Sequence, residues 1–170
     1  MSAHRRKATS AEVRALAHPL RLRIIRLLYD ADRSNKELAD RLHVDPATVL
    51  HHVRTLEKTG FLKAAGTRPG ARGSVEKLYR STGKSWKIDV DAGLPGASRV
   101  SQATMDAFLA ELQAAGPDAD LSTARLALNI NEARREELMA RLGAVLDEYA
   151  LDDDADGEPW ALFVAVHRRG

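Results

Sequence analysis

The side chains best suited to specific contacts lie on one face of a helix that the sequence predicts from Pro46 to Thr59. Val49, Val53 and Leu56 recur at helical spacing, so the face they share is expected to be buried. The other face carries groups that can contact base edges (Ala47, Thr48, His51) and groups that suit phosphates (Arg54, Thr55, Lys58). This division favours insertion into the major groove of double-stranded DNA, with a solvated amphipathic helix as the alternative.

The residues just before that helix predict a second one, joined to it by a tight turn. Ser34 and Glu37 have the spacing of a capping box, in which each side chain bonds the other residue's backbone N–H. His43–Val44 forms the turn, and Asp45–Pro46 restarts the chain as a cap and a first-turn proline. Gly60 is expected to stop the helix. Two helices in this order predict a helix-turn-helix unit.

A basic hairpin is predicted directly after this unit. Residues 61–67 and 75–81 read as two strands around a glycine-rich tip at residues 68–73. Arg68 and Arg72 in the tip could reach phosphates or a narrow minor groove, although a basic hairpin without a ligand would look the same. A hairpin after a helix-turn-helix makes a winged helix. The predicted DNA-backbone contacts of the whole module are Ser34, Lys36, Arg54, Thr55, Lys58, Arg68, Arg72 and Lys77.

Charge divides the chain into two different halves. Residues 1–90 hold 19 Lys and Arg against 9 Asp and Glu, a charge of +10, whereas residues 91–170 hold 7 against 15, a charge of −8. A basic half beside an acidic one favours a nucleic-acid module joined to another region. We expect a flexible basic tail (1–9), a DNA-binding domain (10–88) whose first helix Ser10 can cap, a linker (89–98) and a dimerisation or effector region (99–170).

Several classes of function lack support in the sequence. The chain has no cysteine, which excludes disulfides and thiolate chemistry and agrees with a cytoplasmic protein. No apolar run is long enough to span a membrane. We find no nucleophile and base in a recognisable arrangement and no phosphate-binding glycine loop, so neither an enzyme nor a cofactor is expected. A winged helix used for protein interaction or RNA binding remains the alternative to DNA recognition.

Two groups of residues resemble metal-binding motifs, but neither has the arrangement that a metal site requires. His51 and His52 are adjacent on a helix and point about 100° apart, so they are not expected to share an ion. His52 falls on the packed face and is expected to be a hydrogen-bonded structural residue. The aspartates in the run 152–157 begin like a calcium loop, but Phe163 stands where a glutamate is needed. A solvated acidic turn is the better interpretation.

Four runs carry a family pattern: LAHPLRLRI at 16–24, TVLHHV at 48–53, GFL at 60–62 and EKLYR at 76–80. Together they resemble the ArsR-type winged helix-turn-helix transcription regulators over about residues 12–85. The resemblance implies a homodimer that binds a palindromic operator and usually represses transcription. Leu50 stands where that family has a serine. The metal sensors of that family use thiolates or histidine–carboxylate pairs. This chain has no cysteine, and its predicted helix over 131–150 has no histidine, so metal sensing is not implied. A small-molecule effector remains possible.

The C-terminal half is predicted to combine helices, over 100–115 and 131–150, with short strands over 125–130 and 160–167. The expected fold class is therefore mostly α with small β, a winged helix-turn-helix domain plus a C-terminal α+β dimerisation region. A twofold dimer would present two recognition helices to a palindromic site. The predicted dimer interface is Phe108, Leu112, Leu142 and Leu146, with an intramolecular core as the alternative for each.

Overall fold

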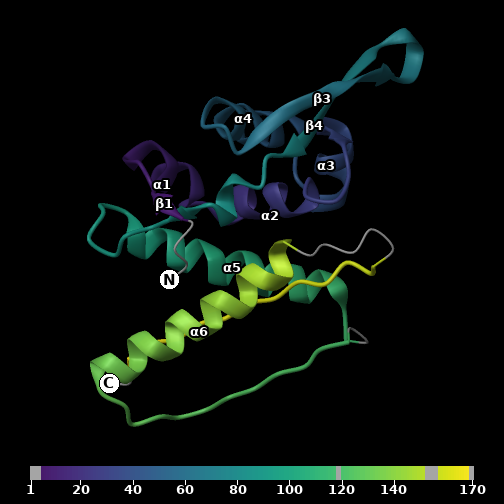
Figure 1. The fold of residues 1–170 in the computed structure, drawn as a ribbon. Coiled ribbons are helices and arrows are strands. Elements are labelled where there is room, and N and C mark those ends of the chain that lie inside the picture. The colour runs from purple at the N-terminus through teal and green to yellow at the C-terminus, as the bar shows by residue number, and fades with distance from the viewer. Residues whose placement is uncertain (1–4, 118–119, 152–156, 169–170) are drawn as a thin grey trace. The chain divides into compact units, whose positions relative to one another are not determined.

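The computed structural model describes residues 5–117, 120–151 and 157–168 of the chain. It is mostly helical with small sheets, as the sequence predicts (Figure 1). Contacts divide the chain into a first unit, Arg6–Pro117, and a second unit formed by the remaining residues. No helix in the described ranges is long and apolar enough to cross a membrane.

Four helices open the first unit, and each begins where the sequence offers a cap. They are α1 (Ser10–Leu16), α2 (Pro19–Leu27), α3 (Asn35–Leu42) and α4 (Pro46–Lys58). The capping box of α3 is confirmed, because the Ser34 hydroxyl accepts from the Glu37 N–H and the Glu37 carboxylate accepts from the Ser34 N–H. For α1 the cap is Thr9 rather than Ser10, since Thr9 forms a second capping box with Glu12.

The turn between α3 and α4 follows from the residues at its two ends. His43 adopts a left-handed conformation with φ of 53°, which ends α3. The Asp45 carboxylate then accepts from the N–H groups of Ala47 (2.8 Å) and Thr48 (3.2 Å), and Pro46 occupies the first turn of α4. Gly60 has φ of 74° just beyond the helix, the region in which glycine carries no steric penalty. The predicted helix-turn-helix is thereby confirmed.

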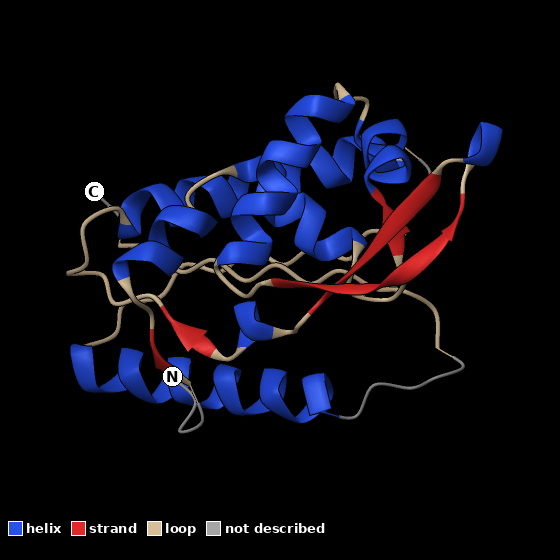
Figure 2. Cartoon of the chain, turned by 90° about the horizontal axis from the view of Figure 1, so that it is seen from above, coloured by secondary structure: helices blue, strands red, loops and turns tan. Residues whose placement is uncertain are grey.

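The wing is an antiparallel hairpin of β3 (Leu62–Pro69) and β4 (Val75–Ser81), with β2 (Arg33–Ser34) on the other side of β4. Figure 2 shows β3 and β4 as a long hairpin ending in the short turn η1 (Ala71–Gly73). The register shifts between Ala64 and Gly66 and then brings Arg68 opposite Glu76. The winged helix expected from the sequence is confirmed.

The N-terminal segment is more ordered than the sequence suggests. Residues 1–9 are expected to be a flexible tail, but Arg6–Lys7 forms β1 and pairs in parallel with β5 (Ile88–Asp89). Ala8 is buried, and its N–H donates to the Asp89 carbonyl at 2.8 Å. The expectation is wrong for this segment, because pairing with a strand some 80 residues away supplies the backbone partners that a local view cannot reveal. Residues 1–4 lie outside the described ranges.

Helix α5 (Ala97–Ala115) belongs to the first unit. It packs on α1 and α2 through a small-residue face that includes Val100, Ala103 and Ala107, and Arg26 of α2 lies 3.7 Å from the Glu111 carboxylate. The contacts thus separate the two units after Pro117, beyond the linker expected at 89–98. In Figure 1, α2 lies between α4 and α5.

The core of the first unit gathers apolar residues from its helices and its wing. The largest fully buried side chains are Phe61, Ile24, Leu28, Leu38, Leu56, Val13, Val49 and Val53. Phe61 and Leu62 at the start of the wing pack with α2, α3 and α4, so the hairpin base is fixed to the helices. The wing tip shares none of this burial and depends on polar contacts for its placement.

The second unit contains α6 (Glu132–Leu151), which Asn131 caps through its side-chain oxygen on the Arg134 N–H at 2.9 Å. The strands expected over 125–130 and 160–167 do not form within the described part of this unit. A strand requires a hydrogen-bonded neighbour, and neither segment pairs with one in the described ranges. None of residues 120–150 and 157–168 is buried.

Candidate nucleic-acid interface

Helix α4 presents two chemically distinct faces. Val49, Val53 and Leu56 are fully buried, as their spacing predicts. The predicted base-contacting residues Ala47, Thr48 and His51 are all exposed on the first turns of the helix. Their side chains are available to a groove of DNA because the Asp45 cap occupies backbone N–H groups and not the side chains.

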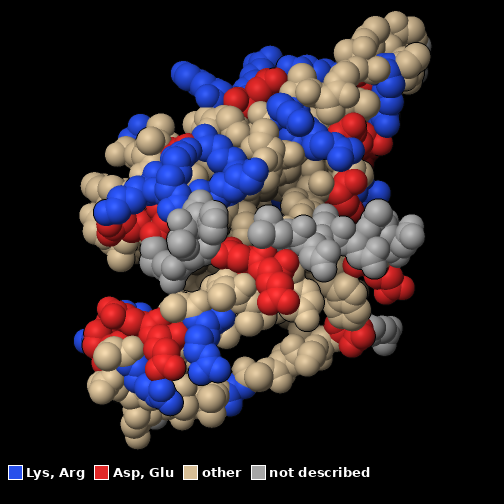
Figure 3. Space-filling view, viewed as in Figure 1, with Lys and Arg blue, Asp and Glu red and all other residues tan. Residues whose placement is uncertain are grey.

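Four of the eight predicted backbone-contacting residues lie on α4 or at the start of α3. Arg54 and Lys58 are exposed further along α4, and Lys36 is exposed at the start of α3. The Thr55 hydroxyl donates to the His51 carbonyl at 3.1 Å, so it is partly engaged within the helix. Figure 3 shows Lys and Arg side chains gathering over the elements of the first unit. This basic surface has the composition of a phosphate-contacting one.

Four predicted contacts need correction or qualification. Ser34 is 2% exposed and its hydroxyl caps α3, so it is a structural residue and not an exposed contact. Lys77 forms an ion pair with Glu57 of α4 at 2.8 Å, and Arg68 forms ion pairs with Glu37 and Glu76, also at 2.8 Å. Carboxylates compete with phosphates for these two cations. The side chain of Arg72 is outside the described structure.

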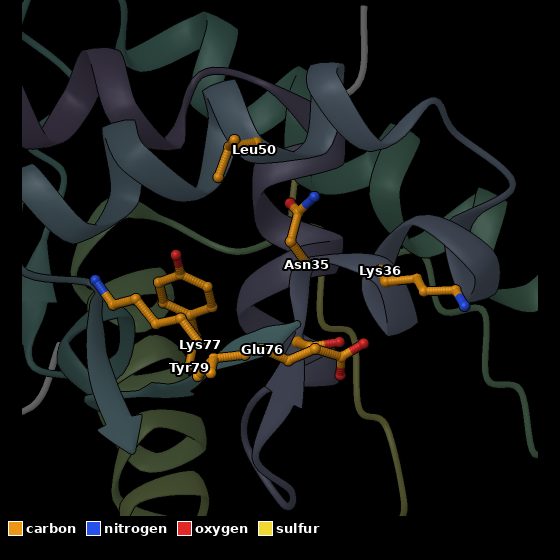
Figure 4. Close-up of a pocket in the computed structure, with 8 residues that line it drawn as sticks. Asn35, Lys36, Leu50, Glu76, Lys77 and Tyr79 are labelled. Carbon is orange, nitrogen blue, oxygen red and sulfur yellow. The ribbon is translucent and has the colours of Figure 1, made fainter. Parts of the chain in front are cut away.

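A groove of about 300 Å³ lies between α3, α4 and β4 (Figure 4). Its lining combines apolar and charged residues, namely Ser34, Asn35, Lys36, Leu50, Val75, Glu76, Lys77 and Tyr79. Sequence reasoning missed Asn35, whose side-chain amide donates to the Pro46 carbonyl at 2.9 Å and so links the starts of α3 and α4. The sequence signal that could have identified Asn35 is its position as the first residue of a capped helix.

Two histidine rings contact each other at a tilt of 51° where the start of α2 meets α4. The rings of His18 and His52 are 4.4 Å apart, and His18 caps α2 by accepting from the Leu20 N–H. Burial lowers the pKa of His52 to about 4, helped by His18, Arg21 and His51, and burial also lowers the pKa of His18. The expectation that His52 is hydrogen-bonded is wrong for its Nδ1, which is buried without a partner in the described structure.

This arrangement predicts a loss of stability in mild acid. His52 binds a proton near its ordinary pKa of 6.5 when unfolded but only near 4 when folded. Unfolding therefore takes up protons below pH 6.5, and the native state should lose about 2 kcal/mol between pH 6.5 and 4. Urea unfolding measured between pH 7 and 5, above the range of most carboxylates, checks this. His52→Gln should flatten the dependence, whereas the exposed control His51→Ala should not; an unchanged slope in His52→Gln would contradict the assignment.

No cluster of three or more potential metal ligands occurs in the described residues. The aspartates at 152–156 that begin like a calcium loop lie outside those residues. His18 cannot readily supply its Nδ1 to an ion, because that atom accepts the Leu20 N–H. The histidines near α4 are therefore best explained by packing and capping.

Comparison with known proteins supports the interpretation of this region. A family model described as a helix-turn-helix domain matches residues 16–63. Two curated relatives, each named HTH-type transcriptional repressor SmtB, come from the CDC 1551 / Oshkosh and H37Rv strains of Mycobacterium tuberculosis. Each is 41% identical over 68 residues, which cover 40% of this chain. The chain spans 46% of the length of these relatives.

Solved structures give a weaker likeness. A cysteine-to-serine mutant of Lactococcus lactis ZitR aligns with a TM-score of 0.35 and 16% identity, covering 76% of this chain and 73% of that one. Wild-type Lactococcus lactis ZitR in complex with DNA gives 0.31 and 17%, with coverages of 84% and 76%. Scores this low do not by themselves establish a shared fold.

The caps, the tight turn and the hairpin define the first unit as a winged helix-turn-helix, and the family model matches its helix-turn-helix part. The repressors named above are similar to it over 68 residues, and the motifs at 16–24 and 48–53 resemble those of the ArsR type.

Proposed function

We propose that this chain is a sequence-specific DNA-binding transcription repressor of ArsR type. The observation that carries the proposal is that α4 has one buried and one exposed face. Val49, Val53 and Leu56 are buried, whereas the predicted base-contacting residues Ala47, Thr48 and His51 are exposed near its N-terminal end. In this docking, Thr48 and His51 hydrogen-bond to base edges in the major groove and Ala47 contacts a thymine methyl. Arg54 and Lys58 contact phosphates. Occupancy of the operator blocks transcription sterically.

We further propose that the repressor is a homodimer. Helix α5 exposes Met105 (38%) and Leu109 (54%), beside the half-buried Phe108 and Leu112 of the predicted interface. Leu142 and Leu146 are half-buried on α6, in a unit without a buried residue between 120 and 150. Apolar surface on both units would be covered by a second copy, and a palindromic operator would match its twofold symmetry. Sedimentation should give twice the mass of one chain; a monomer would contradict this part.

The chain offers no thiolate for sensing, because it contains no cysteine. A small-molecule effector would have to act by favouring one arrangement of the dimer over another, since a ligand that binds both arrangements equally shifts nothing. The proposed setting is the cytoplasm, where a repressor meets its operator. Residues 10–88 bind DNA in this proposal, and the region beyond residue 98 supplies the dimer contacts.

The test is a fluorescence-anisotropy titration of promoter DNA and of scrambled duplex at two salt concentrations. Specific binding should exceed scrambled binding by about a thousandfold or more. Both affinities should fall with salt, because phosphate contacts release counterions. Equal affinity for the two duplexes would reject sequence recognition. Preference for a protein or RNA partner in the same assay format would instead favour the alternative use of the winged helix.

A further inference from the structure

The tip end of the wing is joined to α3 by an ion-pair network centred on Arg68, which lies one residue before the last pair of the hairpin. The Arg68 Nε and Nη2 atoms lie 3.1 Å and 2.8 Å from Glu76 Oε2, directly across the hairpin. The same Nη2 lies 2.8 Å from Glu37 Oε2 on α3. One guanidinium therefore bridges the two strands of the wing and the first helix of the helix-turn-helix.

The network continues into the cap of α3. Glu37 Oε2 also accepts from the Ser34 N–H at 2.7 Å, so the carboxylate that holds Arg68 is fixed by the capping box. Bonding by Ser34 and Arg68 lowers the pKa of Glu37, and bonding by Arg68 and Ser34 lowers the pKa of Glu76. Both carboxylates are therefore ionised at neutral pH. Figure 4 shows Glu76 extending from β4 toward Lys36 at the start of α3.

The charges in this network argue against a simple phosphate contact. Two carboxylates surround one guanidinium, so the group carries a net negative charge, and Glu76 is only 21% exposed in its side chain. A phosphate approaching Arg68 would meet these carboxylates and would have to displace at least one of them. Without Arg68, the two carboxylates would repel each other and separate β4 from α3. The guanidinium suits this task because its planar fork can donate to two acceptors.

We propose that Arg68 is a positioning residue, which holds the wing against α3 through Glu37 and Glu76 so that wing and recognition helix contact the same duplex. The inference rests on the proposed function, and it replaces the direct phosphate contact predicted for this residue from the sequence. The wing tip shares no apolar burial with the helices, so the polar links next to the tip determine its direction. Arg68 acts through its partners and not by touching DNA.

The variant Glu76→Gln tests this proposal by the sign of its effect. Removing a carboxylate near DNA should strengthen binding if charge alone matters, because electrostatic repulsion falls. If the network positions the wing, Glu76→Gln should instead weaken promoter binding by about fivefold, a typical size for coupling within an ion-pair network. Equal or tighter binding by Glu76→Gln would overturn the proposal. Asp40→Asn, which removes an exposed carboxylate from α3, serves as the charge control.

The variant Arg68→Lys separates positioning from phosphate contact. A lysine retains the charge and can still contact a phosphate, but it cannot bridge two carboxylates with the same fork. Positioning predicts that Arg68→Lys weakens binding about as much as Arg68→Ala and that neither changes the salt slope. If Arg68 contacted a phosphate, Arg68→Lys would keep the promoter affinity, and Arg68→Ala would reduce the salt slope by about 1. The control variant Arg54→Ala should show this reduced salt slope. That pattern at Arg68 would overturn the proposal.

A measurement without DNA separates this inference from the proposed function. Amide hydrogen exchange of the free protein should accelerate in residues 70–75 of Glu76→Gln, while the amides of α4 keep their wild-type rates. Unchanged amide exchange in the wing would overturn the proposal that the network positions the wing, even if the chain binds its promoter. A wild-type protein that shows no preference for promoter DNA would reject the proposed function, and the exchange result would still decide whether Arg68 positions the wing.

Discussion

Replacing His51 with alanine should lower promoter affinity about tenfold and leave the affinity for scrambled duplex nearly unchanged. The imidazole is exposed on the second turn of α4 and lies opposite the buried Val49–Val53 face, where a helix in the major groove meets base edges. Losing a base contact removes discrimination, whereas losing a phosphate contact weakens binding to every sequence. Anisotropy titrations against both duplexes measure the two effects separately.

Two further variants complete the experiment on α4. Thr48→Ala should behave like His51→Ala, with a smaller effect because a hydroxyl makes one contact. Arg54→Ala should weaken promoter and scrambled duplex alike and reduce the salt slope by about 1. Equal losses on both duplexes for all three variants would show that the helix binds DNA without reading its sequence. Melting temperatures should stay near wild type, since the three side chains are exposed or surface-facing.

Replacing Glu12 with glutamine should destabilise the first unit by about 3 kcal/mol, because the change breaks a buried ion-pair network. Glu12 is 5% exposed, and its carboxylate accepts from Arg6 at 2.9 Å, Lys84 at 2.6 Å and the Thr9 N–H at 2.8 Å. These contacts join α1 to β1 and η2 (Lys84–Trp86). Urea unfolding at neutral pH measures the loss.

The Glu12 network also predicts a pH signature. Bonding to Arg6 and Lys84 lowers the pKa of Glu12 well below its ordinary value of 4.5. The folded state therefore binds fewer protons, and the stabilisation is present above pH 4.5 and is lost as pH falls below it. Glu12→Gln should lack this acid-dependent part. Glu132→Gln, which breaks an exposed pair with Arg135 on α6, should change the free energy of unfolding much less than Glu12→Gln, because solvent screens that pair. A similar cost for both variants would contradict the role of burial.

Local signals in the sequence were sufficient for the helix-turn-helix and the wing. Ser34 and Glu37 define the start of α3 because a cap and its partner are only three residues apart, and Gly60 marks the end of α4 for a similarly local reason. The expected strand at 75–81 matches β4. Exposure of Thr48 and His51 follows from helical periodicity alone.

The features that sequence reasoning missed depend on contacts between distant residues. The pairing of β1 with β5 and the burial of Glu12 among Arg6 and Lys84 both need the fold before they can be seen. The ion pairs of Arg68 could not be seen in the sequence either, because its carboxylate partners lie on two other elements. The strands expected at 125–130 and 160–167 have the right alternation, but alternation cannot supply a pairing partner.

The absence of buried residues in the described part of the second unit has a consequence for how stability depends on protein concentration. Leu126 is 80% exposed, Trp160 69% and Tyr149 74%, so this unit gains little apolar stabilisation from its own chain. If association with a second copy supplies the missing burial, the free energy of unfolding of this unit contains a term that grows with the logarithm of protein concentration. Scarce copies would then be less stable than abundant ones, and the number of molecules in a cell would help to set the threshold at which the regulator becomes active.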